Sequence, residues 1–220
     1  MRECKRDAES YYMTPTRARK MAQLAEGWFS YIYPLLAKQI VKDFGIREGE
    51  GLDIGCGSAP LSIELAKITS LNMTALDVSP FMAELAWENV RKSGLEDRIQ
   101  VVVGDVQNMP FESDRFDLIV SRGSFHFWED KVKAFQEIYR VLRPGGRTFI
   151  GGGDGYLWPR DPPGIIRKIL FRLGRRLFGP GRKGWMKSRL PRKDWEKILK
   201  EAGIRNYRIF PHHLWINIEK

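Results

Sequence analysis

The stretch LDIGCGSAP, residues 52–60, decides the fold. An apolar run leads into a turn with two glycines, and Pro60 then suits the first position of a helix. Glycine at positions 55 and 57 lets the backbone turn sharply and approach a ligand closely. The helix beyond the turn would present unpaired backbone N–H groups. The stretch therefore predicts a strand, a tight turn and a helix, with a ligand site at the turn or a purely structural turn as alternatives.

Short apolar runs alternate with amphipathic segments on both sides of this stretch. The alternation predicts βαβ units with right-handed crossovers around a buried parallel sheet. We expect strands over residues 51–54, 72–76, 99–103, 116–120, 147–151, 206–210 and 214–218. We expect helices over residues 28–44, 59–68, 80–93, 131–142 and 192–202. Ser79 before Pro80 suits a helix start, Gly45 a helix end, and RPGG at 143–146 a turn.

The chain has 220 residues, which fits one large domain. Within it we expect N-terminal helices forming a lid over residues 1–45 and a ligand-binding core over 46–151. A basic, aromatic insert follows over residues 152–191. Residues 192–220 would complete the core with a helix and two strands.

The charge of the chain is concentrated in one segment. The net charge is +10, and residues 160–200 hold fourteen Lys or Arg against three acidic residues. That segment alone carries +11, so the remainder is close to neutral. This distribution predicts a local basic surface in a protein that is not basic elsewhere.

The bulk composition is that of a water-soluble protein. No apolar stretch approaches the roughly 20 residues needed to span a bilayer, and the start MRECKRDAES has no apolar core typical of a secretory signal. Two cysteines, Cys4 and Cys56, are too few for a disulfide framework. We therefore expect a cytoplasmic protein.

Three aspartates follow successive expected strands. Asp53 lies two residues before Gly55, Asp77 ends the second strand, and Asp105 follows the third. The carboxyl ends of parallel strands share the edge at which open α/β sheets bind ligands. Each aspartate alone is better explained as a helix cap than as a ligand. Three in register with the glycine turn favour a nucleoside site, with Asp77 reaching the ribose hydroxyls, Asp105 the adenine amino group, and Asp53 the amine of a bound amino acid.

A nicotinamide-dependent oxidoreductase is a distant alternative, because Pro60 replaces the third glycine of its usual fingerprint. Five blocks instead resemble the class I S-adenosylmethionine-dependent methyltransferases, above all the small-molecule enzymes of ubiquinone and menaquinone biosynthesis. The blocks are LDIGCGSAPLSIELAK, ALDVSPFMAELAWENV, VVVGDVQNMPF, FDLIVSRGSFHFWED and EIYRVLRPGGR, and they cover roughly residues 50–151. The resemblance implies a Rossmann-like, mostly parallel seven-stranded sheet with helices on both faces and an antiparallel last strand.

The resemblance also implies that S-adenosylmethionine is the cofactor and S-adenosylhomocysteine the product. It places Asp53, Gly55, Gly57 and Ser58 along the methionine and ribose side, with Asp77 at the ribose hydroxyls.

Further residues follow from the same resemblance. Asp105 and the Val106 backbone would meet the adenine, and Ser121 the methionine portion. The family usually has a third glycine where this chain has Ala59, so the geometry of the turn is expected to differ slightly.

Methyl transfer from a sulfonium needs alignment and exclusion of water, and a general base only where the acceptor must lose a proton. The candidates are His126, which follows the fourth strand, and Tyr12, in the N-terminal lid; packing is the competing interpretation for both. Arg122 suits either an acidic partner or a solvated loop. We expect no metal, because nothing at ligand spacing surrounds His212 and His213.

The basic insert admits four interpretations, in falling order of preference. They are a lid helix with a solvated face, recognition of an anionic acceptor, a membrane-surface helix at 165–178 that delivers a lipid-soluble acceptor, and binding of nucleic acid. Nucleic acid is last because no recognised RNA-binding module is present. The sequence thus predicts methyl transfer to a small molecule, with an RNA methyltransferase or a non-catalytic S-adenosylmethionine-binding protein as alternatives.

Overall fold

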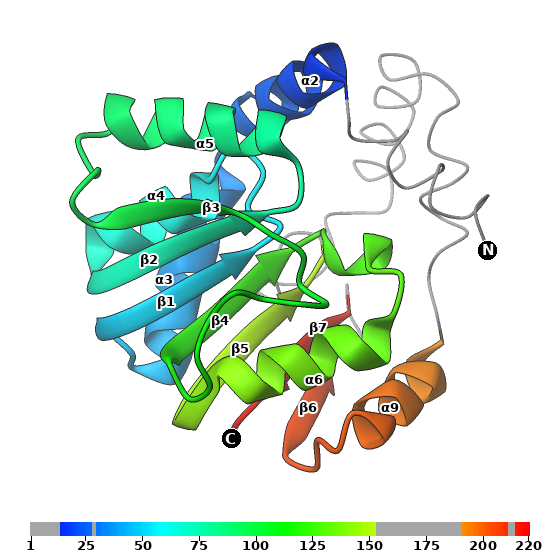
Figure 1. Cartoon of the computed structure of the whole chain (residues 1–220). Coiled ribbons are helices and arrows are strands. Elements are labelled where there is room, and N and C mark those ends of the chain that lie inside the picture. Colours follow the sequence, from blue (N-terminus) through cyan, green and yellow to red (C-terminus); the bar gives the residue numbers. More distant parts are fainter. Residues whose placement is uncertain (1–13, 28–29, 153–190, 211–213) are drawn as a thin grey trace, which may run out of the picture.

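The computed structural model describes residues 14–27, 30–152, 191–210 and 214–220, and shows a seven-stranded sheet (Figure 1). The strand order is β3-β2-β1-β4-β5-β7-β6. Strands β1 to β5 pair in parallel, whereas β7 is antiparallel to both of its neighbours. The strands are β1 (Glu48–Ile54), β2 (Ser70–Asp77), β3 (Ile99–Val103), β4 (Phe116–Arg122), β5 (Leu142–Gly151), β6 (Tyr207–Phe210) and β7 (Trp215–Ile218). The predicted mostly parallel sheet with an antiparallel last strand is confirmed.

Helices cover both faces of this sheet (Figure 1). One face packs against α3, α4 and α5, and the other against α6 and α9. The helices are α2 (Pro15–Glu26), α3 (Ile32–Phe44), α4 (Pro60–Ile68), α5 (Pro80–Lys92), the short 3₁₀ helix η1 (Phe125–Phe127), α6 (Lys131–Val141) and α9 (Arg192–Glu201). Among the described helices, none is long and apolar enough to cross a membrane.

The central strand β4 explains why the sheet needs two layers of helices. Leu118 and Val120 belong to the apolar cluster on the α3 side, whereas Phe116 and Ile119 belong to the cluster on the α6 side. All four side chains are fully buried. A strand that is apolar on both faces is stable only between two layers, which is why its sequence reads as a continuous apolar run.

The local helix signals are confirmed. The Ser79 side chain caps α5 by accepting a hydrogen bond from the Met82 N–H, and Pro80 begins the helix. Gly45 ends α3 with a left-handed φ of 70°.

The prediction for residues 143–146 is wrong. The structure continues β5 back to Leu142, with a register shift against β4 between Phe116 and Leu118. Gly145 still has a φ of 79°, and its N–H donates to the Lys220 carbonyl. The RPGG stretch is therefore an irregular strand start, because the C-terminal residues supply the hydrogen bonds that a turn would have made internally.

Other predictions fall outside the described residues. They concern Tyr12, the insert from 153 to 190 with its segment 165–178, and the pair His212 and His213.

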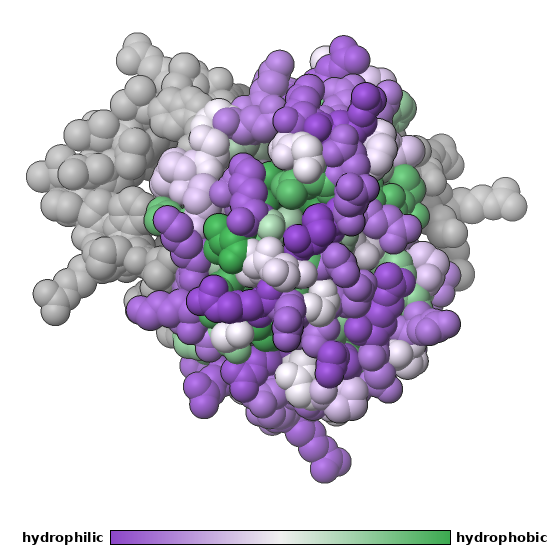
Figure 2. Space-filling model, turned by 90° about the vertical axis from the view of Figure 1, so that its left-hand side faces the viewer, coloured by the Kyte–Doolittle hydropathy of each residue, from purple (hydrophilic) through white to green (hydrophobic). Residues whose placement is uncertain are grey.

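The parallel strands begin on one side of the molecule and end on the opposite side, and below we call these two sides the edges of the sheet. Figure 2 shows the side on which the parallel strands begin, and this side is mainly hydrophilic with small apolar areas between the polar side chains. The opposite edge, where strands β1 to β5 end, carries the glycine turn.

Candidate functional site

The glycine turn leaves β1 at the middle of the sheet, between the ends of β2 and β4. The N–H groups of Gly55 and Cys56 both donate to the Leu76 carbonyl, at 2.7 and 3.0 Å. The turn is thereby fastened to the end of β2, which is followed at once by Asp77. This fastening brings the first two predicted site segments together.

The two glycines of the turn have different reasons to be glycine. Both have left-handed backbone angles, with φ of 65° at Gly55 and 58° at Gly57. A β-carbon on Gly55 would also collide with the Ser124 side chain, whereas one on Gly57 would meet nothing within 4 Å. Gly55 is therefore required by close packing, and Gly57 faces open space where a ligand can approach the backbone.

Ala59 occupies the position at which the sequence departs from the expected third glycine. It adopts a left-handed conformation, φ 61° and ψ 30°, and is fully buried. This conformation costs a non-glycine residue about 1–2 kcal/mol. The turn thus keeps a glycine-like backbone despite the methyl group. Cys56, also buried in the turn, has a thiol pKa raised well above its usual range by burial, which suits a space-filling role.

Asp77 ends β2 with its carboxylate held by the backbone. One oxygen accepts from the Gly57 N–H and the other from the Ser79 N–H, both at 2.9 Å. The residue is 8% exposed, and burial raises the pKa of its carboxyl although these N–H groups lower it. Each carboxylate oxygen retains a lone pair, so the group is oriented to accept further hydrogen bonds from hydroxyls.

Asp53 lies deeper, on the face of the sheet covered by α4. It is 2% exposed and accepts a 2.7 Å hydrogen bond from the Ser62 hydroxyl. The pKa of Asp53 is raised to about 7, because burial and, to a smaller extent, the Asp77 charge raise it by more than the Ser62 hydrogen bonds lower it. Among the described residues neither aspartate forms an ion pair, so a cationic ligand would stabilise the ionised form.

The Ser58 hydroxyl gives a direct test of whether a polar ligand fits the turn. The residue is 2% exposed, and its Oγ has no hydrogen-bond partner among the described residues. Buried polar atoms are rarely left without a hydrogen-bond partner. The Ser58 carbonyl, in contrast, accepts from the Asn89 amide, which also donates to Glu26 on α2. The Ser58 hydroxyl can therefore form a hydrogen bond with a ligand that carries hydroxyl or amine groups.

Two serines after β4 connect that strand to the turn. The Ser124 hydroxyl donates to the Ile54 carbonyl at 3.0 Å, and the Ser121 and Ser124 hydroxyl oxygens lie 2.6 Å apart. Since the Ser124 proton is used on Ile54, Ser121 must donate to Ser124. The Ser121 oxygen is then left as an acceptor, which suits an ammonium group better than a carboxylate.

The end of β3 carries the predicted adenine residues. Val106 is buried, whereas Asp105 is exposed and accepts hydrogen bonds from the backbone and side chain of Gln107. Two apolar side chains lie open near this edge: Val78 is 62% exposed and Val103 is 53% exposed. An apolar, planar ligand would cover such side chains.

His126 lies in η1, close to the end of β5. Its ring stacks on Phe125, with centroids 3.9 Å apart, and its Nε2 lies near Gly152, just after β5. Arg122 is not a solvated loop residue: it ends β4, and its guanidinium donates to the Tyr33 hydroxyl at 3.2 Å. Both groups thus lie at the carboxyl edge.

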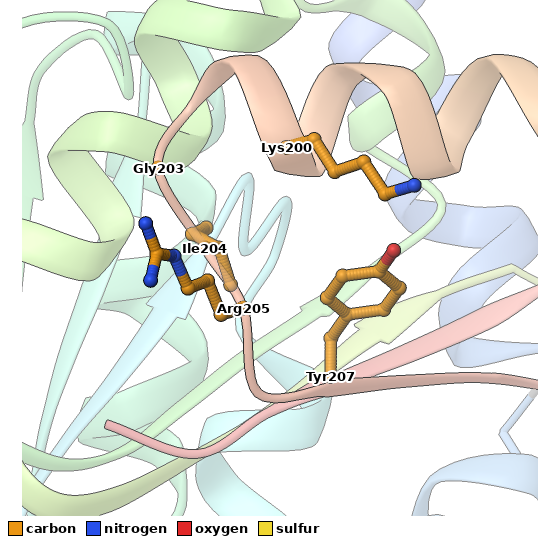
Figure 3. A pocket seen from close by; sticks show the side chains of 5 residues that line it. All are labelled: Lys200, Gly203, Ile204, Arg205 and Tyr207. Carbon is orange, nitrogen blue, oxygen red and sulfur yellow. The ribbon is translucent and has the colours of Figure 1, made fainter.

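A hollow of about 400 Å³ lies elsewhere, between α9 and β6 (Figure 3). Its lining includes Lys200 and Tyr207, whose polar ends point toward one another in Figure 3. Tyr207 pairs with Ile218, whereas the other end of β7, Trp215, pairs with Gly151. The hollow is therefore at the edge opposite the glycine turn and is not part of the site.

Sequence reasoning missed three residues that shape the site. They are Tyr33, Ser62 and Ser124. Ser62 could have been found, because it falls among the buried residues of α4, where a polar side chain needs a partner. Nothing in the sequence relates Tyr33 or Ser124 to the turn, since their contacts span 89 and 70 residues of chain.

Comparison with known proteins gives consistent matches. The family described as "Methyltransferase domain" matches residues 52–150, which contain the glycine turn and all three aspartates. A crystal structure from Methanococcus maripaludis, of a protein assigned to the S-adenosyl-L-methionine-dependent methyltransferases, is 39% identical. It superposes with a TM-score of 0.83 and is covered over 93% of its length, with 94% of this chain aligned.

Two further relatives carry more specific names. Demethylmenaquinone methyltransferase of Lactobacillus johnsonii is 33% identical over 51% of this chain and 48% of its own length. The structure of Haemonchus contortus phosphoethanolamine N-methyltransferase 2, in complex with phosphomonomethylethanolamine and S-adenosylhomocysteine, is 25% identical with a TM-score of 0.59. It aligns over 84% of this chain and 43% of that one.

The chain spans about half or less of the length of most curated relatives it matches, from 27 to 55%. The Methanococcus maripaludis match, in contrast, extends over nearly the whole of both chains. The chain belongs to the family of S-adenosyl-L-methionine-dependent methyltransferases.

Proposed function

We propose that this protein transfers a methyl group from S-adenosylmethionine to a small-molecule acceptor. One observation carries the proposal: two buried carboxylates at adjacent strand ends flank a glycine turn, and among the described residues neither has an ionic partner. Uncompensated buried carboxylates are unfavourable unless a ligand supplies the missing hydrogen bonds or charge. A nucleoside joined to an amino acid supplies both.

Different residues of the described site would bind different parts of the cofactor. Asp77 would accept hydrogen bonds from the ribose hydroxyls, because its oxygens are already oriented by two N–H groups. Asp53 would hold the α-ammonium, and Ser121 would contact the methionine portion. Gly57 and the Ser58 hydroxyl would line the path between these two ends.

The adenine would lie at the ends of β2 and β3. Asp105 and the Val106 backbone would meet its polar edge, and the open Val78 side chain would pack against its ring. Asp105 must then share its carboxylate with Gln107, its present partner.

The bound cofactor would supply a methyl group on a sulfonium, so the protein has mainly to align the acceptor and keep water out. His126 lies at the carboxyl edge and would take a proton from an acceptor that must lose one, with Tyr12 as the second candidate. The His126 ring stacks on Phe125, which in turn packs edge to face on Trp128 at 6.5 Å between centroids. They would keep that side of the reaction space dry.

For the acceptor, we infer an anionic or lipid-soluble small molecule. Two relatives are named for demethylmenaquinone and for phosphoethanolamine, which represent these two chemistries. The concentrated positive charge of residues 160–200 suits both, by pairing with an anion or by contacting a membrane surface that holds a lipid-soluble acceptor.

A transfer assay tests the proposal. The protein is incubated with S-adenosylmethionine labelled in its methyl group, together with a small-metabolite extract, a lipid extract or total RNA in separate reactions. We expect label in a small-molecule or lipid product with release of S-adenosylhomocysteine. Label in RNA alone, or tight cofactor binding with no labelled product from any extract, would overturn the small-molecule assignment.

A further inference from the structure

The connection between β3 and β4, residues 104–115, carries Asp105 and Val106. Figure 1 shows it leaving the end of β3 and reaching the start of β4. This described connection contains no regular helix or strand, so its shape depends on other contacts. The Asn108 N–H donates to the Asp105 carbonyl at 3.0 Å and closes a turn, and Met109, which follows the turn, is buried on the α6 side of the sheet.

Two side chains of α6 bind the backbone of this connection. The Glu137 carboxylate accepts from the Met109 N–H at 2.9 Å. The Arg140 guanidinium donates to the Met109 carbonyl at 3.2 Å and to the Phe111 carbonyl at 2.8 Å. Both backbone polar groups of Met109 are thus bonded to α6, which fixes the end of the turn that begins at Asp105.

Glu137 and Arg140 are also bonded to each other. The Arg140 Nε donates to one Glu137 oxygen at 2.7 Å, and its Nη2 donates to the other at 2.8 Å. This two-pronged contact holds the pKa of the Glu137 carboxyl below its ordinary range, so the pair remains ionised near neutral pH. An isolated surface ion pair contributes little, but a two-pronged pair that also bonds three backbone groups fixes the chain in one position.

A second link joins the connection to the start of α6. The Asp130 N–H donates to the Gln107 side-chain oxygen at 2.6 Å, and the Gln107 side-chain nitrogen donates to both oxygens of Asp105, at 3.2 and 3.1 Å. Asp105 itself is exposed. The direction of its carboxylate therefore depends on α6 at two points, through Gln107 and through Met109.

We propose that the Glu137–Arg140 pair sets the base specificity of the cofactor site, by holding Asp105 and the Val106 backbone against the edge of adenine. This inference rests on the proposed cofactor site. Adenine presents an amino donor beside a ring-nitrogen acceptor, whereas hypoxanthine presents an oxygen beside a ring N–H. A carboxylate next to a backbone N–H matches adenine and opposes both groups of hypoxanthine.

The position of these two protein groups decides how well the bases are distinguished. Hydrogen bonds weaken steeply when their distances and angles change, so a shifted turn loses the adenine contacts first. Glu137 and Arg140 act through the backbone of the connection and are positioning residues.

Calorimetric binding of two ligands that differ only in the base tests this inference. They are S-adenosylhomocysteine and S-inosylhomocysteine, in which hypoxanthine replaces adenine. We expect the native protein to prefer the adenosyl ligand by about tenfold or more. Arg140→Met should lower this preference to about threefold or less, by weakening the adenosyl ligand while leaving the inosyl ligand within about twofold. Glu137→Gln should have an intermediate effect, because glutamine still accepts from the Met109 N–H but loses the charged pair.

Arg143→Met is the matched control, because it also removes an arginine–carboxylate pair, with Asp117 at the opposite edge of the sheet. It should keep the full preference. Asp77→Ala should weaken both ligands alike, because both contain the ribose. Arg140→Lys keeps the charge without the planar fork and should recover part of the preference, and it replaces Arg140→Met should that variant not fold.

The inference is overturned if the Arg140 and Glu137 variants keep the native preference, or if they weaken the two ligands alike. Equal binding of the two ligands by the native protein would also overturn it, since the site would then have no base specificity to set. Failure of the native protein to bind either ligand would contradict the proposed function itself.

Discussion

Carboxylates at the two ends of the parallel strands have different partners. At the edge where the strands begin, Asp117 accepts from the Glu50 N–H and pairs with Arg143, and Asp114 pairs with Lys220 at 2.6 Å. At the edge where they end, Asp53 and Asp77 are buried, and within the part of the chain that the structure describes their hydrogen-bond donors are hydroxyl and N–H groups.

The difference separates structural acids from functional ones. An acid with a fixed cation is satisfied within the chain, and removing it costs stability. A buried acid without one has a raised pKa and keeps bonding capacity for a ligand.

The largest expected effect concerns the glycines of the turn. Gly55→Ala adds a left-handed penalty and a collision with Ser124, so it should lower the free energy of unfolding by about 3 kcal/mol. Gly57→Ala meets no neighbour and should lose only about 1 kcal/mol. Urea unfolding of both variants measures the difference. Equal losses would mean that Ser124 does not hold Gly55 as the structure shows.

The next effect is a pH dependence of cofactor affinity. With the pKa of Asp53 near 7 in the free protein, binding an ammonium below that pH must first remove a proton. Affinity for S-adenosylhomocysteine should therefore rise about tenfold from pH 6 to pH 8. Calorimetry across this range checks it, and Asp53→Asn should bind more weakly with a flat profile. A profile unchanged by that substitution would assign the pH dependence to another group.

The same carboxyl has the opposite effect on stability. Its pKa is higher in the folded than in the unfolded protein, so the folded state binds the proton more tightly. This contribution is complete below the unfolded pKa of about 4 and is lost as the pH rises through about 7. Asp53→Asn should therefore raise the free energy of unfolding at pH 8 by about 1–3 kcal/mol. A destabilised variant at pH 8 would show that Asp53 is compensated within the chain, as Asp117 is.

The smallest effect is expected at Ala59. Ala59→Gly relieves about 1–2 kcal/mol of left-handed strain. It also removes a buried methyl group worth about 0.8 kcal/mol and gives the unfolded chain more conformational freedom, worth about 0.4–1 kcal/mol. The free energy of unfolding should change by less than about 0.5 kcal/mol, because these opposing terms nearly cancel. Thermal unfolding beside Gly57→Ala measures this. A gain above 1 kcal/mol would show that the strain dominates and is retained at the cost of stability.

The sequence predicted most of the sheet and the positions of the three aspartates, because strand–helix alternation and strand-end placement are local patterns. The start of β5 was not predictable, since Gly145 bonds to Lys220 at the far end of the chain. The contact between Arg122 and Tyr33 was not predictable either, because Tyr33 approaches this arginine only when α3 packs on the sheet. Features set by neighbouring residues could thus be predicted from the sequence, whereas contacts between distant segments became known only from the structure.

One measurement tests the central claim that the carboxyl edge is the cofactor site: calorimetric binding of S-adenosylhomocysteine to the native protein, Asp77→Ala and Asp117→Ala. We expect saturable binding to the native protein, and a loss of about 1–3 kcal/mol of binding free energy in Asp77→Ala. Asp117→Ala should bind within twofold of native while losing stability to urea, because its carboxylate serves only the opposite edge. Absence of binding by the folded native protein, or equal weakening by both variants, would contradict the account.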